Sequence, residues 1–349
     1  MRPRSRIAAL VTAAIATAAV ATGCGGSSPQ LVSIGAGLRG PSGLRATVYA
    51  TGLSKAAAFA FDSRGRLWVA TADYTDKGHD GVYLVASRGA KPTEIVTGLH
   101  TPLGLLWYHD SLYVTSTGRI DAYSELRGDR FTRRRTILAL PAHVGESNNI
   151  VLAPNGRMLM GISASCDHCT PASKLSGAIV SFRPDGRDLR VYAAGIRAPV
   201  GLAFYPGTHD LFVTMNQRDD LGARTPGDWL AVVNEGEAWG FPRCYGQSGA
   251  VCHGVPQPVA VLDQHAAAGD VAIVTGELGS KVGTAALVAE WAKGTVLRVT
   301  LHRSGSHSRG TAAPFLTGVR NPVALIVTGD HALLVGDWAT GTIYRIAAG

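Results

Sequence analysis

The chain of 349 residues carries a formal net charge of +8, yet charged side chains make up only 17% of it. Three of the arginines fall within the first six residues, and elsewhere only Arg133, Arg134 and Arg135 stand together as a basic run. Nucleic-acid-binding proteins normally concentrate basic side chains on one face. The composition therefore argues against nucleic acid as a partner.

The N-terminus has the pattern of an export signal. Basic residues precede an apolar run over residues 7–21, which is shorter than the roughly 20 residues that span a bilayer. The run leads into VATGC, which resembles a bacterial lipobox and predicts cleavage before Cys24 and attachment of lipid to its sulfur. We therefore predict a lipoprotein signal peptide over residues 1–23, a flexible tether over residues 24–43, and a place on the extracytoplasmic face of a bacterial membrane. An ordinary secretory signal that contains a cysteine is the alternative.

Beyond residue 44 the chain repeats one pattern of short apolar strands separated by Gly, Asp-Gly or Asn-Gly turns. One unit reads AAFAFDSRGRLWVAT, GVYLVAS and PTEIVTGL, and another reads GLAFYPGTHDLFVT and DWLAVV with PQPVAVL after an insertion. The first hairpins of the successive units fall near residues 57–71, 103–115, 150–163, 201–214, 271–289 and 323–336. Six units of four strands predict a six-bladed β-propeller over residues 44–349.

The two ends of this region complement each other. The last unit stops after GTIYRI and lacks a fourth strand, whereas RATVYATGL stands before the first unit without a partner. We predict an all-β fold in which this N-terminal strand completes the last blade and closes the ring. A β-sandwich or a two-domain all-β protein is the alternative, but neither explains the sixfold repeat.

Four cysteines remain after the export signal, in CDHC and CYGQSGAVC. An exported chain meets oxidising conditions, so the close spacing predicts two local disulfides, Cys166 with Cys169 and Cys244 with Cys252. The alternative is a zinc site that includes His168 and His253.

The densest charge lies in MNQRDDLGARTPGDW, residues 215–229. A solvated loop is the ordinary explanation for such a run. Here the run falls between the second and third strands of the fourth unit, so the propeller predicts that it projects over one face of the ring, where loops of several blades converge.

Several segments in order resemble one known family. These segments are IVLAPNGRMLMGISASCDHC, GAIVSFRPDG, YAAGIRAPVGLAFYPGTHDLFVT, PGDWLAVVNEGEAWGFPRCYG and NPVALIVTGDHALLVGDWATGTIYRI. Together they resemble the glucose/sorbosone dehydrogenases, six-bladed propellers similar to soluble quinoprotein glucose dehydrogenase, from about residue 50 to the end. The resemblance implies pyrroloquinoline quinone (PQQ) and calcium as cofactors and a sugar as substrate.

The resemblance also implies a set of site residues. Quinone carboxylates need cations and calcium needs oxygen ligands. The expected cofactor-binding residues are Arg197, Arg218 and His265, and the expected metal ligands are Asn216, Asp219 and Asp228. Sugar oxidation needs a base, a role that histidine fills near neutral pH, and His143 is the candidate. The family position for this histidine aligns with Gly145, two residues away, and Ala198 stands where the family usually has asparagine.

The expected function is therefore that of an exported, lipid-anchored dehydrogenase, dependent on PQQ and calcium, which oxidises an aldose or sorbosone-type sugar and passes electrons to an acceptor in or near the membrane. Two alternatives remain from the sequence. One is a non-catalytic propeller that binds a carbohydrate or an envelope partner. The other is a calcium-dependent lactonase, since six-bladed propellers also host that reaction.

Overall fold

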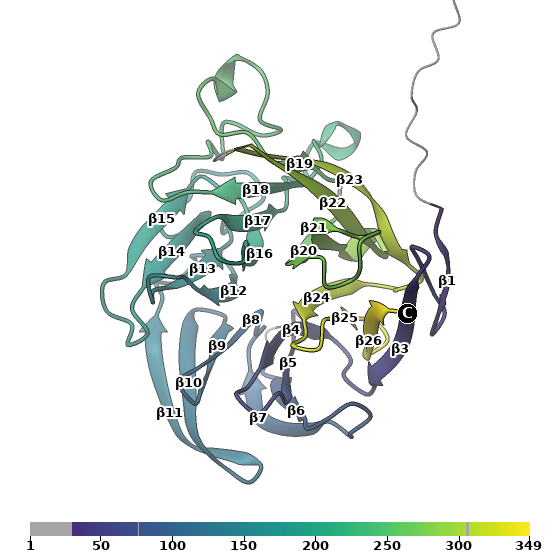
Figure 1. Cartoon of the computed structure of the whole chain (residues 1–349). Helices are drawn as coiled ribbons and strands as arrows, with labels where there is room; N and C mark the ends of the chain where they lie inside the picture. Colours follow the sequence, from purple (N-terminus) through teal and green to yellow (C-terminus); the bar gives the residue numbers. More distant parts are fainter. Residues whose placement is uncertain (1–29, 76, 305–306) are drawn as a thin grey trace, which may run out of the picture.

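Antiparallel four-stranded sheets are arranged around a central axis in the computed structural model, which describes residues 30–75, 77–304 and 307–349 (Figure 1). Blades 1 to 3 consist of β4 (Ala56–Phe61), β5 (Leu67–Thr71), β6 (Asp80–Val85), β7 (Thr93–Leu99); β8 (Gly104–Tyr108), β9 (Ser111–Ser116), β10 (Arg119–Arg127), β11 (Arg130–Ala139); and β12 (Ser147–Leu152), β13 (Met158–Ile162), β14 (Ala178–Phe182), β15 (Arg190–Ala194). The predicted signal peptide and Cys24 lie outside the described residues.

Blades 4 to 6 complete the ring. They consist of β16 (Pro199–Phe204), β17 (Leu211–Met215), β18 (Trp229–Val233), β19 (Ala260–Val261); β20 (Ala268–Thr275), β21 (Thr284–Glu290), β22 (Thr295–Ser304), β23 (His307–Thr317); and β24 (Pro322–Val327), β25 (Leu333–Asp337), β26 (Thr342–Ala348) with β3 (Leu44–Ala50). Three short 3-10 helices, Gly222–Arg224, Ala250–Cys252 and Trp291–Lys293, lie in the connections. Among the described residues, no helix has the length and apolar character needed to span a bilayer.

The core of the protein lies between neighbouring blades. The second strands β5, β13, β17 and β25 are buried along their whole length. Outer strands such as β11 are mostly exposed. Second strands are covered on both faces by adjacent sheets, which explains why they read as continuous apolar runs in the sequence. The six-bladed all-β prediction is confirmed.

The ring closes as predicted. Strand β3 pairs antiparallel with β26, from Leu44 opposite Ala348 to Ala50 opposite Ile343. This pairing gives blade 6 its fourth strand and leaves no unpaired edge on β26. Both strands lie at the right of the ring in Figure 1.

The predicted tether of residues 24–43 is wrong for its second half. Strands β1 (Val32–Gly35) and β2 (Leu38–Gly40) form a hairpin, and Arg39 of β2 pairs with Thr317 of β23. Ile34 and Leu38 are buried against blades 5 and 6. These apolar side chains bind the segment to the ring, so blade 5 becomes a sheet of six strands.

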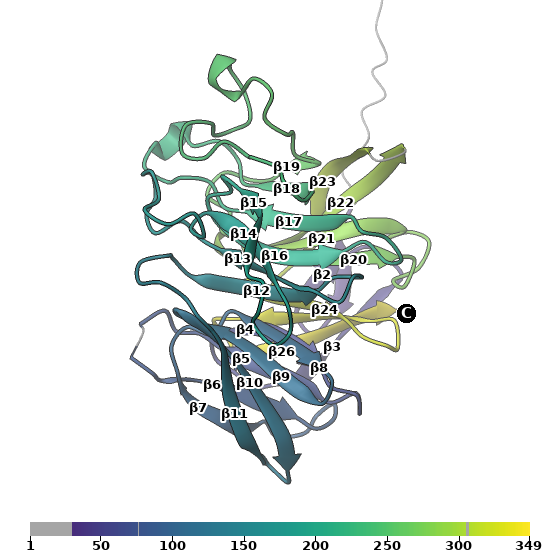
Figure 2. The same cartoon turned by 90° about the vertical axis from the view of Figure 1, so that its left-hand side faces the viewer.

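Two further features bear on the site. The insertion between β18 and β19 contains the disulfide Cys244–Cys252 and projects from the rim at the top of both views (Figure 1, Figure 2). At the axis, the Asp270 carboxylate of β20 accepts hydrogen bonds from Asn149 Nδ2 of β12 (2.8 Å) and from the backbone N–H groups of Val271 (2.9 Å) and Leu325 (3.3 Å). One carboxylate thus joins blades 3, 5 and 6.

Candidate functional site

A pocket of about 680 Å³ opens at one end of the axis; we call it the axial pocket. Its lining comes from loops that follow the second strand or precede the first strand of blades 1, 3, 4, 5 and 6. Loops of one propeller face converge in this way because all first strands begin at the same end of the axis. A volume of this size suits a small-molecule ligand.

Aromatic side chains form one part of the wall: Tyr74, Trp291 and Trp338. The two indole rings meet edge to face, with their centroids 5.7 Å apart. Trp338 is held further by a hydrogen bond from Nε1 to Ala72 O (2.8 Å) and by the ammonium of Lys55, 3.4 Å from its ring centroid. The wall therefore presents rings whose orientation is set before a ligand arrives.

Tyr74 lies on the loop after β5 in a conformation that its side chain disfavours. Its φ is +58° and its surface is 51% exposed. A bulky residue at positive φ is uncommon, and such strain tends to occur at ligand-binding positions. Tyr74 therefore offers an aromatic surface to the pocket at a cost in backbone energy.

Polar side chains form another part of the wall. Asp73, Glu146, Asn148 and Asn216 contribute carboxylate and amide groups. The Asn148 amide is already fixed, because its Nδ2 donates to Ser163 Oγ (2.9 Å) and to Pro199 O (2.8 Å). Asn216 Oδ1, by contrast, is buried without a hydrogen-bond partner. An unsatisfied buried acceptor loses free energy that a bound hydroxyl or amide donor would restore.

Arg197 is the one cationic side chain among the described residues of the lining, and its charge is matched within the protein. Its NH2 group lies 2.6 Å from Asp167 Oδ1, its Nε donates to Asp167 O (3.0 Å), and its NH1 donates to Asn216 O (3.3 Å). The predicted cofactor-binding arginine thus does reach the pocket. It arrives there already paired with a carboxylate.

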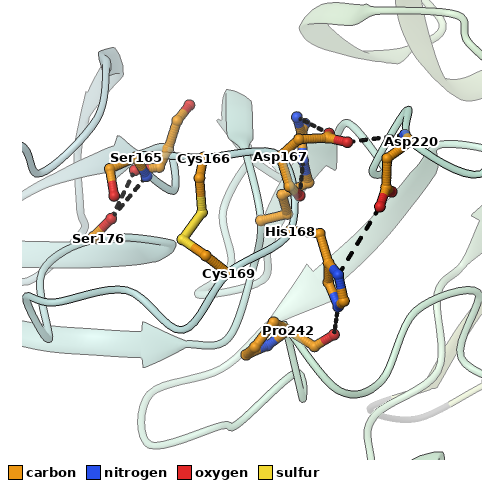
Figure 3. Close-up of a disulfide and its surroundings, with 10 residues drawn as sticks. Ser165, Cys166, Asp167, His168, Cys169, Ser176, Asp220 and Pro242 are labelled. Atoms are coloured by element: carbon orange, nitrogen blue, oxygen red, sulfur yellow. Dashed lines mark hydrogen bonds and ion pairs between the residues drawn. A yellow bond between two sulfur atoms is a disulfide. The ribbon is translucent and has the colours of Figure 1, made fainter.

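Asp167 belongs to the loop closed by the predicted disulfide Cys166–Cys169, which the structure contains (Figure 3). Besides Arg197, its carboxylate accepts hydrogen bonds from the backbone N–H groups of Asp219 (2.9 Å) and Asp220 (2.9 Å). One side chain therefore fastens the charged loop of blade 4 to the cysteine loop of blade 3. Both disulfide predictions agree with the structure, and the zinc alternative is wrong for these four cysteines.

Arg218, predicted to bind the cofactor, contacts other groups of the protein. Its Nε and NH2 groups each lie 2.5 Å from the Asp220 carboxylate, and its guanidinium stacks 4.6 Å from the ring centroid of Tyr245. The side chain is buried and is absent from the described lining of the axial pocket. The guanidinium of Arg218 is thus bound by an acidic and an aromatic neighbour away from the axial pocket.

His265 and Asp219 form a pair on the surface. Nδ1 of His265 lies 2.7 Å from Asp219 Oδ1, and Nε2 lies 2.9 Å from Gly222 O. Both partners accept hydrogen bonds, so the contact with Asp219, followed by that with Gly222, raises the pKa of His265. Neither side chain lines the described axial pocket. The predicted roles in cofactor and metal binding are not supported.

Asp228 is buried beneath the charged loop rather than exposed at the pocket. Its carboxylate accepts the backbone N–H groups of Gln217 (2.8 Å) and Ala268 (3.2 Å), and burial raises its pKa to about 6. It fastens the start of the loop to the start of β20. Of the three predicted metal ligands, only Asn216 lies in the pocket wall.

The residues therefore do not fit the predicted calcium site. Across the described ranges, no group of three or more His, Cys, Asp or Glu side chains is placed to share a metal ion. Asp219 and Asp228 bind different partners, as described above.

His143 lies outside the axial pocket, in a separate pocket of about 400 Å³. The described axial lining contains no histidine, and Gly145 occupies the family position. Gly145 has a φ of +99°, and a Cβ there would lie 2.1 Å from Ser163 O. A side chain at position 145 is therefore excluded by the local backbone, and His143, the predicted base, lines the neighbouring pocket instead.

The pocket is large enough for a quinone but has the wrong charge for PQQ. A quinone with several carboxylates needs uncompensated cations. The described lining supplies the acids Asp73 and Glu146, together with Arg197, whose charge Asp167 matches. The fit is thus to a neutral, hydroxyl-rich molecule rather than to a polycarboxylate.

The sequence interpretation missed Asp167 and the aromatic wall. Asp167 was visible between the two cysteines of CDHC, but its partners lie 30 to 53 positions later in the chain. Trp338 stands in GDWATG directly after a predicted strand, the position from which loops reach the axis. That position was the available signal.

Comparisons with known proteins place this geometry in context. No protein-family model matches the chain. An uncharacterized protein of Borreliella burgdorferi is 22% identical over 227 residues, which cover 60% of this chain and 58% of that protein. The alignment thus spans little more than half of the curated relative.

Solved structures match over most of the ring. The PQQ-bound form of aldose sugar dehydrogenase from Streptomyces coelicolor matches with a TM-score of 0.69 and 20% identity, covering 88% of this chain and 99% of that chain. The apo-form of soluble aldose sugar dehydrogenase from Escherichia coli matches with a TM-score of 0.68 and 14% identity, covering 88% of this chain and 100% of that chain. The holo form of the PQQ domain of pyranose dehydrogenase from Coprinopsis cinerea matches with a TM-score of 0.72 and 16% identity, covering 89% of this chain and 97% of that chain. The predicted resemblance to sugar dehydrogenases is confirmed at the level of the fold.

Proposed function

We propose that the axial pocket binds a sugar or a closely related polyhydroxy compound. The observation that carries the proposal is a wall that combines three aromatic rings with acids and amides while its one arginine is already paired. Apolar C–H faces of a sugar pack on aromatic rings, and its hydroxyl groups exchange hydrogen bonds with carboxylates and amides. The similar solved structures are sugar dehydrogenases, which supports the same class of ligand.

The role of each group follows from its position. Tyr74 and the indole of Trp338 would contact the sugar ring, and Glu146 would accept a hydroxyl proton in a hydrogen bond. A hydroxyl group placed against Asn216 would satisfy its buried Oδ1. Arg197 would stay in its ion pair with Asp167 and shape the wall without attracting anions.

The N-terminal sequence supports a location outside the cytoplasm for this activity. We propose cleavage before Cys24, lipid attachment and display of the ring at the extracytoplasmic face of a bacterial membrane. The observations behind this are the short apolar run and the VATGC motif.

Binding of simple aldoses tests the proposal. Calorimetric titration of the purified ring with glucose, galactose, mannose and xylose should give saturable binding of at least one of them. Tyr74→Ala should weaken that binding about 10-fold, a loss of about 1.4 kcal/mol. Tyr108→Ala, a tyrosine of β8 that stacks on His109 away from the pocket, is the matched control and should bind like the parent. Absence of binding for all four sugars would contradict the proposal.

A second candidate is oxidation of the bound sugar with PQQ, calcium and an acceptor at the membrane. The similar solved structures favour it, since they include a PQQ-bound form of an aldose sugar dehydrogenase. Reconstitution separates the candidates. If binding alone is the function, added PQQ and calcium ions leave no bound-quinone absorption, and an aldose reduces no artificial electron acceptor. A bound spectrum with turnover that Arg197→Ala abolishes would favour the dehydrogenase instead.

A further inference from the structure

A second pocket adjoins the axial pocket on the same face of the propeller; we call it the side pocket. It has a volume of about 400 Å³. Its wall comes from the loops before β8 and after β9 and from residues 140–146, which connect blade 2 to blade 3. The axial pocket draws on every blade except blade 2. The side pocket thus fills the one remaining sector of the ring.

The two pockets share a wall. Tyr74, Gly145 and Glu146 line both of them. Gly145 has no side chain, and Ser163 O fills the space that a Cβ would take, so the side chains shared by the two pockets are those of Tyr74 and Glu146. A ligand that extends past these two side chains from the axial pocket would enter the side pocket.

The side pocket is built from strained but well-fixed backbone. Tyr74, Thr101 and His143 have φ values of +58°, +46° and +62°. Such conformations cost about 1–3 kcal/mol each and persist where the surroundings impose them. Here the buried carboxylate of Asp80 accepts the backbone N–H groups of Asp73 (2.9 Å) and Thr101 (3.2 Å), so it holds the loops of blades 1 and 2 together. The loops that line the side pocket are therefore held in defined conformations.

The chemistry of the side pocket matches that of the axial pocket. It offers the imidazole of His143, the carboxylate of Glu146 and the hydroxyl groups of Thr101 and Thr117, with Tyr74 as an aromatic surface. Lysine and arginine are absent from its described lining, as is any metal-ligand cluster. Such groups exchange hydrogen bonds with neutral hydroxyl-rich molecules and do not select anions.

We propose that the side pocket is a second sugar subsite, so that the ligand of this face is a disaccharide or a longer oligosaccharide with one residue in each pocket. The inference rests on the proposed function, because the first residue occupies the axial pocket. The inference adds that the ligand has at least two sugar units, and that His143 contacts the second sugar unit. Tyr74 then lies at the linkage between the two sugar units.

The test compares each aldose that binds with disaccharides made from it, by calorimetric titration of the same preparation. The probes are maltose and cellobiose for glucose, lactose for galactose, mannobiose for mannose and xylobiose for xylose. At least one disaccharide should bind about 10-fold more tightly than its monosaccharide. His143→Ala should abolish this gain and leave monosaccharide affinity unchanged.

His109→Ala is the matched control, since His109 is also an exposed histidine at positive φ (+46°) but lies in the turn between β8 and β9. It should keep the full gain. Disaccharide affinities within about 2-fold of the monosaccharide, or an equal loss of both affinities in His143→Ala, would overturn the subsite. A failure of every monosaccharide and disaccharide to bind would instead overturn the proposed function on which the subsite rests.

Discussion

Asp73, in the wall of the axial pocket, and Asp270, among the first strands around the axis, are held in opposite ways. Asp73 at the mouth accepts the backbone N–H and the hydroxyl of Thr75, and the backbone contact, followed by the hydroxyl, lowers its pKa. Asp270 is enclosed by first strands, keeps only limited surface open to the axis, and burial raises its pKa to about 7. The Asp73 carboxylate in the pocket wall is therefore ionised at neutral pH, whereas the Asp270 carboxyl group serves to join blades.

The largest expected effect follows from removing the carboxyl group of Asp270. Asp270→Ala leaves Asn149 Nδ2 and two backbone N–H groups without their acceptor, which should lower the free energy of unfolding by about 3–5 kcal/mol. Denaturation in urea measures this loss. Asp73→Ala is the matched control and should keep a midpoint close to that of the parent. Similar midpoints for the two variants would show that the contrast between mouth and interior is wrong.

A smaller effect concerns pH. Burial raises the folded-state pKa of Asp270 to about 7, above its ordinary value near 4, so the native state binds more protons than the unfolded state between these values. Stability should therefore fall as pH rises from 5 to 7, by at most about 1.4 kcal/mol per pH unit from this group. Asp228 and Glu290, whose pKa values burial raises to about 6 and about 8, act in the same direction.

Asp270→Asn keeps the shape of the side chain and removes its titration. Melting temperatures measured at half-unit pH steps should fall less steeply for Asp270→Asn than for the parent. Parallel curves for the variant and the parent would show that a group other than Asp270 causes the pH dependence. Asp73→Asn should leave the slope between pH 5 and 7 unchanged, because a lowered pKa contributes stability that is lost only as the pH falls below the ordinary carboxyl value near 4.

The smallest expected effect tests the paired charge at the mouth. Asp167→Ala removes the partner of Arg197 and exposes a free guanidinium to the pocket. Affinity for the sugar acid glucuronate, relative to glucose, should rise about 5-fold at low salt and less at high salt. Asp185→Ala removes the partner of Arg187, far from the pocket, and should leave the ratio unchanged. An unchanged ratio in Asp167→Ala would mean that Arg197 is not accessible to ligands.

Strand, turn and strand repeat along the chain, so the blades could be predicted from apolar runs and turn residues. The pairing of β3 with β26 is distant in sequence but could be predicted because the last unit lacks a fourth strand. The disulfides followed from close spacing. The hairpin of β1 and β2 was missed because Ile34 and Leu38 bury against blades that are distant in sequence.

The candidate site was predicted less well, because its contacts join different loops. From their positions in the sequence, Arg197 and Asn216 were expected near the axis, and both line the axial pocket. It could not reveal that Asp167 neutralises Arg197 or that Tyr245 and Asp220 enclose Arg218. Nor could it reveal that the backbone around Gly145 excludes a side chain, since Ser163 O lies across the loop.

The pairing of β3 with β26 also governs when the protein can fold. A ribosome makes β3 early, whereas its partner follows about 300 residues later, so the ring has contacts of very long sequence separation. Until Thr342–Ala348 emerges, β3 and the outer edge of β25 have no strand to pair with. A chain that lacks this strand leaves two strand edges unpaired, and such edges pair readily with other chains. Closure of the ring therefore also protects the protein against edge-to-edge aggregation.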